Sequence, residues 1–202
     1  MATFTRNGYG QVEPNQLSAQ KTGQIYASLP LAAEVSVLQN GEFMYYDYKT
    51  KTVTADATIG EPMLVFNEIK LYEPFWRTSY KDFALIRVGD NYVTSKLATA
   101  GYGDGAENTG VAANPAHTEY GYRMDGIAPR LFKTNIGDIY TTNMVKVGEE
   151  YAEGDLLTPV KNDETKTLVL EKTADTTGML WQVAKVYTMP DGQPGLKIQR
   201  VQ

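Results

Sequence analysis

Apolar and polar residues alternate over the last part of the chain, from residue 145 to residue 201. Leu168 and Leu170 fall on one face of the pattern and Val169 on the other, and the alternation resumes over residues 181–187. A period of two is typical of β-strands and differs from the period of an amphipathic helix. The pattern therefore predicts an antiparallel unit, a small barrel or a small sandwich, in this part of the chain.

A similar pattern occurs earlier, and residues 40–72 can be aligned with residues 153–187. Each copy has a glycine followed by an acidic and an apolar residue, then a hairpin rich in Lys and Thr, then a glycine-led apolar strand that ends in Tyr. In the hairpin, residues 49–54 are placed against residues 165–170. An internal duplication would put related strands into one sheet or barrel. The alternative is a chance match between two ordinary β-meanders.

The chain divides into four segments by pattern. These are an extended N-terminal arm, residues 1–34; a first β unit, residues 35–98; a long loop rich in Gly, Ala and Asn, residues 99–126; and a second barrel-like unit, residues 127–202. The only helical stripe is short, at residues 29–35. The predicted fold class is therefore all-β, with one or two small β-barrel or β-sandwich units.

Two of these segments are expected to depend on contacts for their order. The arm is polar and buries too little to fold alone, so it is predicted to be disordered or laid against a neighbour. A loop as long as residues 99–126 is rare in a compact domain unless it is functional. It is either a contact loop between subunits or a mobile insertion.

Composition narrows the functional classes. The net charge is −5, which gives no basic surface for nucleic acid. The chain has no cysteine, which excludes disulfides, thiolate zinc sites and cysteine nucleophiles. No apolar leader and no apolar span is visible, so we expect no membrane association and a protein that is made and kept in the cytoplasm, or leaves it as part of something larger. The 14 tyrosines suit strands and also contacts between proteins.

Candidate chemistry is sparse. His117 is the only histidine, and none of the serines lies in a Gly-x-Ser-x-Gly elbow. A set of loop side chains could offer oxygen ligands to a cation, but their spacing lacks the calcium-loop pattern. That set is Asp104, Glu107, His117, Glu119 and Asp125. The sequence therefore predicts a protein that is not an enzyme and has no catalytic residue, no cofactor and no metal.

Three stretches together resemble a known group of proteins. They are the phrase Val-Gly-x-x-Tyr-x-x-Gly-Asp-Leu-Leu at residues 147–157, the glycine-led strand through Trp181 and Val183, and the closing run at residues 191–201. They look like the β-rich structural proteins of tailed-bacteriophage heads, especially capsid decoration, cement or head auxiliary proteins. The resemblance is clearest over residues 145–202 and weaker over the first copy of the repeat.

The resemblance implies a structural virion protein on the capsid surface that stabilises contacts between capsomers. Its implied partners are the major capsid protein and copies of itself, commonly in a homotrimer. The arm and the long loop then supply candidate intersubunit contacts, which are Phe4, Tyr9, Val12, Leu17, Ile25, Tyr26, Tyr102, Tyr120 and Tyr122.

Two alternatives stay open. One is another virion part, such as a tail, baseplate, fibre-base or minor head protein. The other is a glycan-binding β-sandwich, in which exposed tyrosine rings stack on sugars. The rings in question are Tyr9, Tyr102, Tyr120 and Tyr122.

Overall fold

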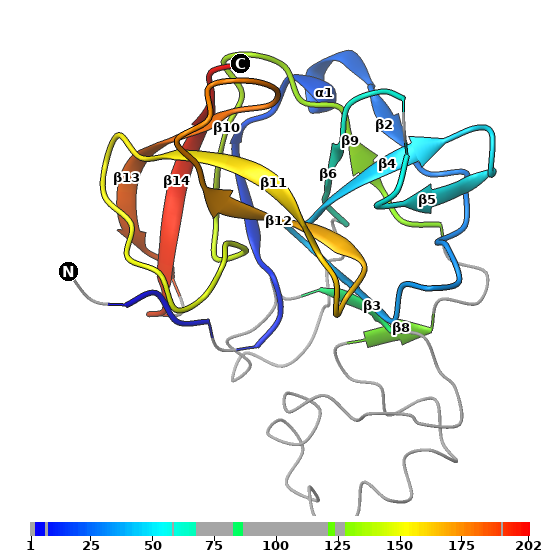
Figure 1. The fold of residues 1–202 in the computed structure, drawn as a ribbon, viewed down its shortest axis with the longest axis horizontal. Coiled ribbons are helices and arrows are strands. Elements are labelled where there is room, and N and C mark those ends of the chain that lie inside the picture. The colour runs from blue at the N-terminus through cyan, green and yellow to red at the C-terminus, as the bar shows by residue number, and fades with distance from the viewer. Residues whose placement is uncertain are drawn as a thin grey trace, which may run out of the picture.

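The computed structural model shows an all-β fold, as the alternation predicted. It describes residues 3–6, 8–57, 59–67, 83–86, 121–123, 128–190 and 192–202. Within these ranges one antiparallel sheet curls into half a barrel, and a second, smaller sheet lies beside it (Figure 1). The fold class predicted from the sequence is confirmed.

The large sheet has 11 strands. They are β1 (Val12–Gln16), β2 (Ile25–Tyr26), β4 (Phe43–Asp47), β5 (Thr52–Thr54), β6 (Met63–Val65), β9 (Leu131–Phe132), β10 (Ile139–Thr142), β11 (Leu156–Asn162), β12 (Thr167–Lys172), β13 (Trp181–Thr188) and β14 (Pro194–Arg200). Their order is β1-β10-β14-β13-β11-β12-β4-β6-β9-β2, and β5 pairs with β4 alongside this path.

The second sheet has three strands and the described chain has one short helix. The strands are β3 (Val37–Gln39), β7 (Ala84–Ile86) and β8 (Gly121–Arg123), with β7 and β8 parallel. Helix α1 (Ser18–Thr22) connects β1 to β2 and ends at Gly23, which takes φ of 69°. The helix suggested for residues 29–35 does not form; that stretch contains a turn and an isolated bridge instead.

The large sheet contains the same strand connectivity twice. In the first half β4 pairs with β5 and β6, and β9 pairs with β6 and β2. In the second half β11 pairs with β12 and β13, and β14 pairs with β13 and β10. Each half opens with the sequence Gly-x-Ile-Tyr, at residues 23–26 and 137–140, and each of these glycines has a positive φ. The repeat suggested by the sequence is therefore a repeat of structure.

The turns that lead into β4 and β11 match bond for bond. The Gln39 N–H donates to the Glu42 carboxylate at 2.8 Å, and the Glu42 N–H donates to the Gln39 carbonyl at 3.3 Å. Ala152 and Asp155 repeat both bonds at 2.8 and 3.2 Å. The acidic residue after each glycine thus closes the turn that precedes it, which fixes Gln39 and Ala152 as equivalent positions.

The two Lys/Thr-rich hairpins also match. Asp47 and Asn162 each accept a hydrogen bond from the N–H two residues on, at 2.8 and 2.9 Å. Each loop ends on a lysine with positive φ, 57° at Lys51 and 58° at Lys166. These two lysines are therefore equivalent. The alignment made from the sequence, which put Lys51 opposite Thr167, is one residue out in this hairpin.

The two halves share one core. Strand β12 of the second half pairs with β4 of the first at Leu168 and Phe43. The buried ring of Trp181 lies 5.8 Å from the Phe43 ring and 5.0 Å from the Tyr140 ring, so strands from both halves pack on it. Of the two predicted alternatives, one β unit or two, the described chain forms one.

The N-terminal segment packs against the barrel of the same molecule. Strand β1 pairs antiparallel with β10, with Val12 opposite Thr142. Phe4, Val12 and Leu17 are all buried in the common core. The segment predicted as an arm, residues 1–34, is therefore part of the barrel wherever it is described. The sequence shows that it cannot fold alone, but not that its apolar residues have a place within the same molecule.

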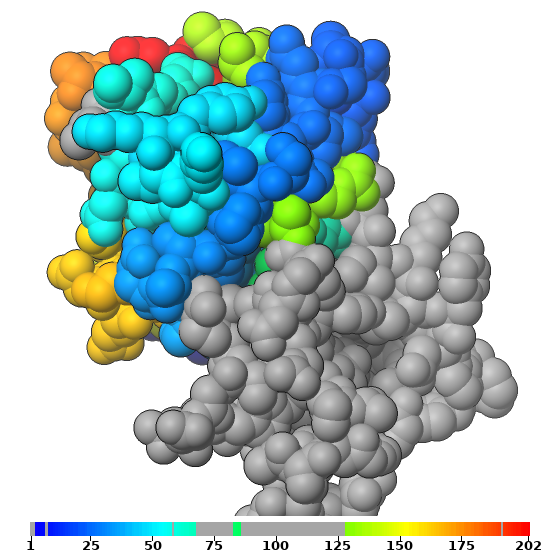
Figure 2. Space-filling view, turned by 90° about the vertical axis from the view of Figure 1, so that its right-hand side faces the viewer, coloured from blue at the N-terminus to red at the C-terminus, as the bar shows by residue number. Residues whose placement is uncertain are grey.

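The halves differ in the connection between their last two strands. Residues 189–193 join β13 to β14, whereas residues 66–130 join β6 to β9. The long loop predicted at residues 99–126 belongs to this connection, and of that loop only β8 lies within the described residues. The first half, coloured blue to cyan, forms much of the barrel surface in Figure 2.

Candidate functional site

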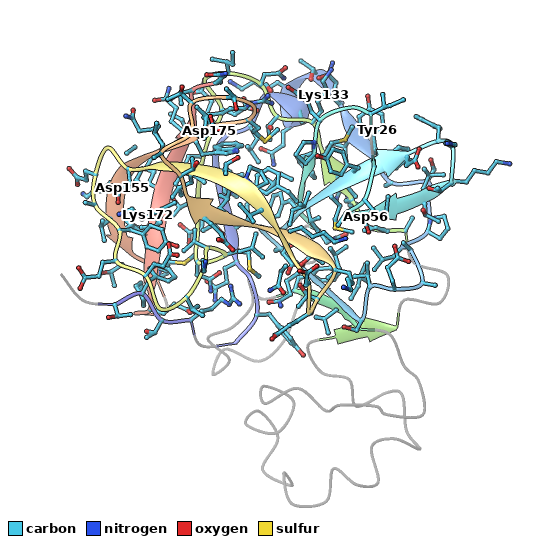
Figure 3. All side chains as sticks on the ribbon, in the orientation of Figure 1. Tyr26, Asp56, Lys133, Asp155, Lys172 and Asp175 are labelled. Atoms are coloured by element: carbon cyan, nitrogen blue, oxygen red, sulfur yellow. The ribbon has the colours of Figure 1, made fainter. Side chains whose placement is uncertain are left out.

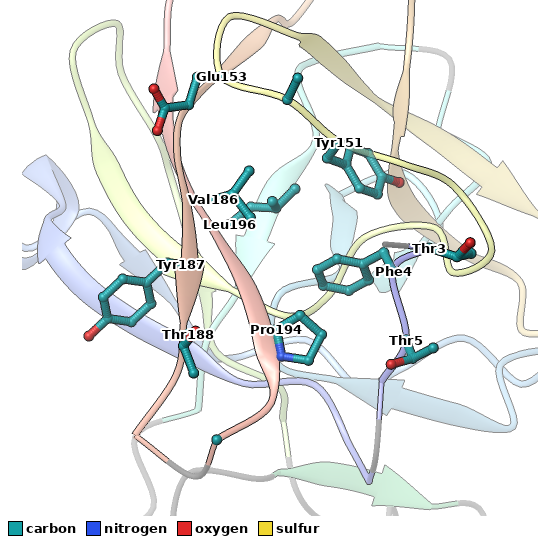
Figure 4. Close-up of a pocket in the computed structure, with 12 residues that line it drawn as sticks. Thr3, Phe4, Thr5, Tyr151, Glu153, Val186, Tyr187, Thr188, Pro194 and Leu196 are labelled. Carbon is teal, nitrogen blue, oxygen red and sulfur yellow. The ribbon is translucent and has the colours of Figure 1, made fainter. Parts of the chain in front are cut away.

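A groove lies between the N-terminal segment, the turn before β11 and the β13–β14 hairpin (Figure 4). Its volume is about 710 Å³, within the range of ordinary ligand pockets. Phe4, Tyr151 and Leu196 are buried beneath it, while the side chain of Val186 is 46% exposed. The groove thus presents an apolar surface that solvent can reach.

Backbone pairing holds one wall of the groove in place. The Phe4 N–H donates to the Glu149 carbonyl at 2.7 Å, and the Phe4 carbonyl accepts from the Gly148 N–H at 3.0 Å. The Phe4 ring meets the Tyr151 ring edge to face, with centroids 5.6 Å apart. The Tyr151 hydroxyl donates to the Lys146 carbonyl at 2.8 Å, and burial, helped by the Glu149 charge, raises the pKa of this phenol.

The polar groups along the groove are few and mostly uncharged. Threonine hydroxyls line it on both sides, from Thr3 and Thr5 in the N-terminal segment and Thr188 at the end of β13, and Glu153 is the carboxylate in its lining. Such a lining suits an apolar group or a chain segment held by contact and backbone hydrogen bonds. It contains no paired nucleophile and base within the described lining residues.

A second candidate surface is a row of three tyrosines, Tyr26, Tyr46 and Tyr48. The Tyr26 and Tyr46 ring centroids are 5.2 Å apart, and those of Tyr46 and Tyr48 are also 5.2 Å apart. The row runs outward from half-buried Tyr26 on β2 to Tyr48, which is 70% exposed. The Ser28 N–H donates to the Tyr46 hydroxyl at 3.2 Å, and this bond restrains the middle ring of the row.

Comparison of the halves explains why this row is exposed. In the second half, Thr141 and Thr142 on β10 are buried because β1 pairs with that strand. Their equivalents beside β2, Ala27 and Ser28, are exposed. In the order of the large sheet β2 is an end strand, whereas β10 lies between β1 and β14. The tyrosine row therefore borders a sheet edge that no described strand covers.

The carboxylate of Glu42 is buried at the junction of the halves. The Glu42 carboxylate accepts from the Gln39 N–H at 2.8 Å and from the Thr167 hydroxyl at 2.9 Å. Burial raises the pKa of Glu42 to about 7, opposed by these hydrogen bonds and by the charge of Arg6. Burial also lowers the pKa of Arg6, which the Glu42 charge opposes. Because Glu42 is enclosed, its visible role is to close its turn.

The equivalent acid in the second half has the opposite environment. Asp155 lies beside Lys172 (Figure 3), with the ammonium nitrogen 2.8 Å from the carboxylate. The hydrogen bond from Lys172 is the main reason that the pKa of Asp155 is lowered. The same turn position thus carries a buried acid in one half and an ion-paired surface acid in the other.

The structure places the nine contact residues predicted from the sequence in several environments. Phe4, Val12 and Leu17 are buried in this chain, Tyr9, Ile25 and Tyr26 are half-buried, Tyr102 and Tyr120 lie outside the described residues, and Tyr122 is on β8 with its side chain outside the described part. The first three pack in the core of their own chain: Val12 lies on β1, which pairs with β10, Phe4 is held by its backbone bonds to residues 148 and 149, and Leu17 precedes α1. Contact between subunits stays a prediction for the set. Tyr46 and Tyr48 were missed: their spacing of two residues puts them on one side of the chain, but only the pairing of strands brings Tyr46 to Tyr26.

The candidate cation ligands of residues 104–125 lie outside the described residues. Among the residues that the structure does describe, no group of three or more His, Cys, Asp and Glu side chains is placed to hold a metal ion. In that same part of the chain no helix has the length and apolar character to span a membrane. Comparison with known proteins matches no family model, no curated protein and no solved structure.

Proposed function

We propose that this protein is a non-enzymatic structural component of a phage particle, which binds the outer surface of the capsid and stabilises contacts between capsomers. The proposal begins from the resemblance over residues 145–202. In the structure the residues that carry the resemblance are turn and strand positions, such as the acid of the turn before β11 and buried Trp181. They stabilise the fold, so the functional proposal has to be argued from a different feature of the structure.

The tyrosine row is the observation that carries the proposal. The three rings pack in a row beside a sheet edge that no described strand covers, and the outermost, Tyr48, is 70% exposed. Tyrosine is enriched in protein interfaces, since its ring contributes apolar area while its hydroxyl remains hydrogen-bonded. Rings that are fixed before binding lose little side-chain entropy when a partner covers them. The row therefore suits contact with another protein.

The length of the connection from β6 to β9 supports the same conclusion. Residues 66–130 stand where the second half uses residues 189–193, so the fold itself does not need so long a segment. Long insertions on a stable scaffold commonly carry binding contacts. We propose that this connection and the tyrosine row together meet the capsid subunit and neighbouring copies, with the homotrimer as the assembled form.

Co-sedimentation with purified empty heads tests the proposal. The variant Tyr46→Ser/Tyr48→Ser removes the outer rings, and Ile136→Ser, at a site 71% exposed on the turn before β10, is the matched control. We expect the double variant to bind heads at least about tenfold more weakly, the size of effect that loss of an interface centre gives. The control should bind as the unmodified protein does.

The same variants, tested also against tails, baseplates and a glycan array, separate the alternatives. Unchanged binding of the double variant to heads would contradict the contact surface. Binding to purified tails or baseplates, with none to heads, would favour another virion part. Binding to sugars on a glycan array, lost in the double variant, would favour a glycan-binding module.

A further inference from the structure

The small sheet shows how one turn of this fold accepts an added strand. Residues 37–40, which lead into the first turn, are covered by β7: Leu38 pairs with Leu85, and the Asn40 N–H donates to the Phe83 carbonyl at 3.3 Å. Phe83 and Leu85 are both buried. An extended segment with apolar residues at alternate positions thus completes this edge.

The second half has the same edge, and no described strand lies on it. Because Ala152 is equivalent to Gln39, residues 150–153 are equivalent to residues 37–40. Tyr151 takes the place of Leu38, and Glu153 takes the place of Asn40. The Glu153 N–H makes no backbone hydrogen bond with any described residue, whereas the Asn40 N–H is bonded to β7.

The groove described above runs along this edge. Tyr151 lies on one side of it and Val186 on β13 on the other (Figure 4), and Ala152 and Glu153 also line it. The N-terminal segment covers only the adjoining part, through the bonds of Phe4 to residues 148 and 149. The groove therefore combines a strand edge that no described strand covers with an apolar floor, the two features that recognition by strand addition uses.

We infer that this groove is a docking site for an extended strand of a partner polypeptide, which adds antiparallel to residues 150–153 as β7 adds to residues 37–40. The strand places a large aliphatic side chain opposite Tyr151, over Leu196 and against Val186. Its backbone carbonyl accepts the Glu153 N–H. This inference concerns the edge and the groove, and it does not depend on the capsid as the partner.

Charge indicates the chemistry of the strand's ends. Glu150 and Glu153 are both exposed at the edge, and neither side chain forms an ion pair with a described residue. Basic residues flanking the aliphatic position would complement them. The β7 segment has this composition, with Lys81 and Arg87 on either side of the apolar run in the sequence. A peptide of the β7 sequence is therefore the natural probe.

The test uses the intact protein and a fluorescent peptide with the sequence of residues 81–88, Lys-Asp-Phe-Ala-Leu-Ile-Arg-Val. Fluorescence anisotropy should show saturable binding, and hydrogen exchange should show new protection of the Tyr151 and Glu153 amides. A peptide carrying Leu85→Glu should bind at least about tenfold more weakly, since a buried carboxylate would face the Tyr151 ring.

Two protein variants complete the design. Val186→Lys places a charge in the groove and should weaken binding at least about tenfold, while Ile136→Lys, an exposed apolar site away from the groove, should not. If Val186→Lys does not fold, the test of the inference is the hydrogen-exchange protection of the Tyr151 and Glu153 amides in the unmodified protein. Absence of binding, or binding without protection at residues 150–153, would overturn the inference. If the protein self-associates and Val186→Lys abolishes this, the assignment of the groove to a partner polypeptide is wrong, because the occupant would then be a second copy of this chain.

Discussion

Glu42 shows how one residue position can be used in two ways by the two halves. It closes its turn as Asp155 does, but it is buried and its pKa is raised to about 7 from its usual 4.5. An acid with a raised pKa in the folded state costs no stability below pH 4.5, where both states are protonated. As the pH rises from 4.5 to 7 the unfolded state ionises first, so stability falls over that window and the full cost is present above it.

Glu42→Gln should therefore flatten the dependence of stability on pH between 4.5 and 7. The difference between the pKa of Glu42 in the unfolded and the folded state corresponds to roughly 3 kcal/mol, which is an upper bound for the pH-dependent change in the free energy of unfolding that the variant removes. Urea unfolding at several pH values measures it. Asp155→Asn is the matched variant: its acid has a lowered pKa, so the variant should lose stability above pH 4 and show no gain near neutral pH. A Glu42→Gln profile parallel to that of the unmodified protein would contradict the assignment.

Tyr140 and Tyr26 are a second equivalent pair. Both follow the isoleucine of Gly-x-Ile-Tyr, yet Tyr140 is fully buried and its hydroxyl has no hydrogen-bond partner among the described residues. Burial raises the pKa of Tyr140 well above its usual value. An unpaired buried hydroxyl is destabilising.

Tyr140→Phe should keep the ring contact with Trp181 and remove the unpaired group. We expect the free energy of unfolding to rise by about 1 kcal/mol. Tyr26→Phe, at the half-buried equivalent, should change it little. Chemical denaturation of the three proteins measures the difference. A loss of more than about 1 kcal/mol in Tyr140→Phe would show that the hydroxyl is bonded after all.

At the scale of elements, strand β1 pairs with β10, whereas no described strand pairs with the equivalent edge of β2. It buries Val12 and covers Thr142, and the residues before it bring Phe4 onto the groove wall. A terminal segment that completes a sheet in this way belongs to the folded domain. Its removal is therefore a test of stability before it is a test of binding.

Deletion of residues 1–16 should lower the melting temperature and expose the β10 edge. The loss of two buried apolar side chains, Phe4 and Val12, alone amounts to several kcal/mol at typical values for core residues. Thermal unfolding by circular dichroism, with light scattering to detect association at the new edge, measures both effects. A deletion variant that unfolds at the original temperature would show that β1 is an unattached arm.

The sequence predicted the strand-rich character and the repeat, since period-two alternation, glycine positions and the Lys/Thr hairpins are local signals. It placed the hairpin register one residue out, because that register depends on which lysine takes the left-handed conformation. It also missed the tyrosine row. Tyr26 and Tyr46 are far apart in sequence, and only the pairing of β2, β9, β6 and β4 brings them together.

At the scale of the whole molecule, the repeat makes each half a reference for the other. The second half has β1 where the first has an edge that no described strand covers, and the first half has β7 where the second has a groove. Both differences lie at the surface, while the shared core around Trp181 joins the halves. The described part of the molecule is thus a scaffold with two edges that no described strand covers, which suits a part that is completed by its neighbours.

Cryo-electron microscopy of the phage particle tests the central proposal most directly. The account predicts barrel-shaped density on the outside of the capsid, absent from particles that lack this protein, with Tyr46 and Tyr48 against the capsid subunit or a neighbouring copy. Density elsewhere in the particle, or on the capsid with Tyr48 exposed to solvent, would contradict it.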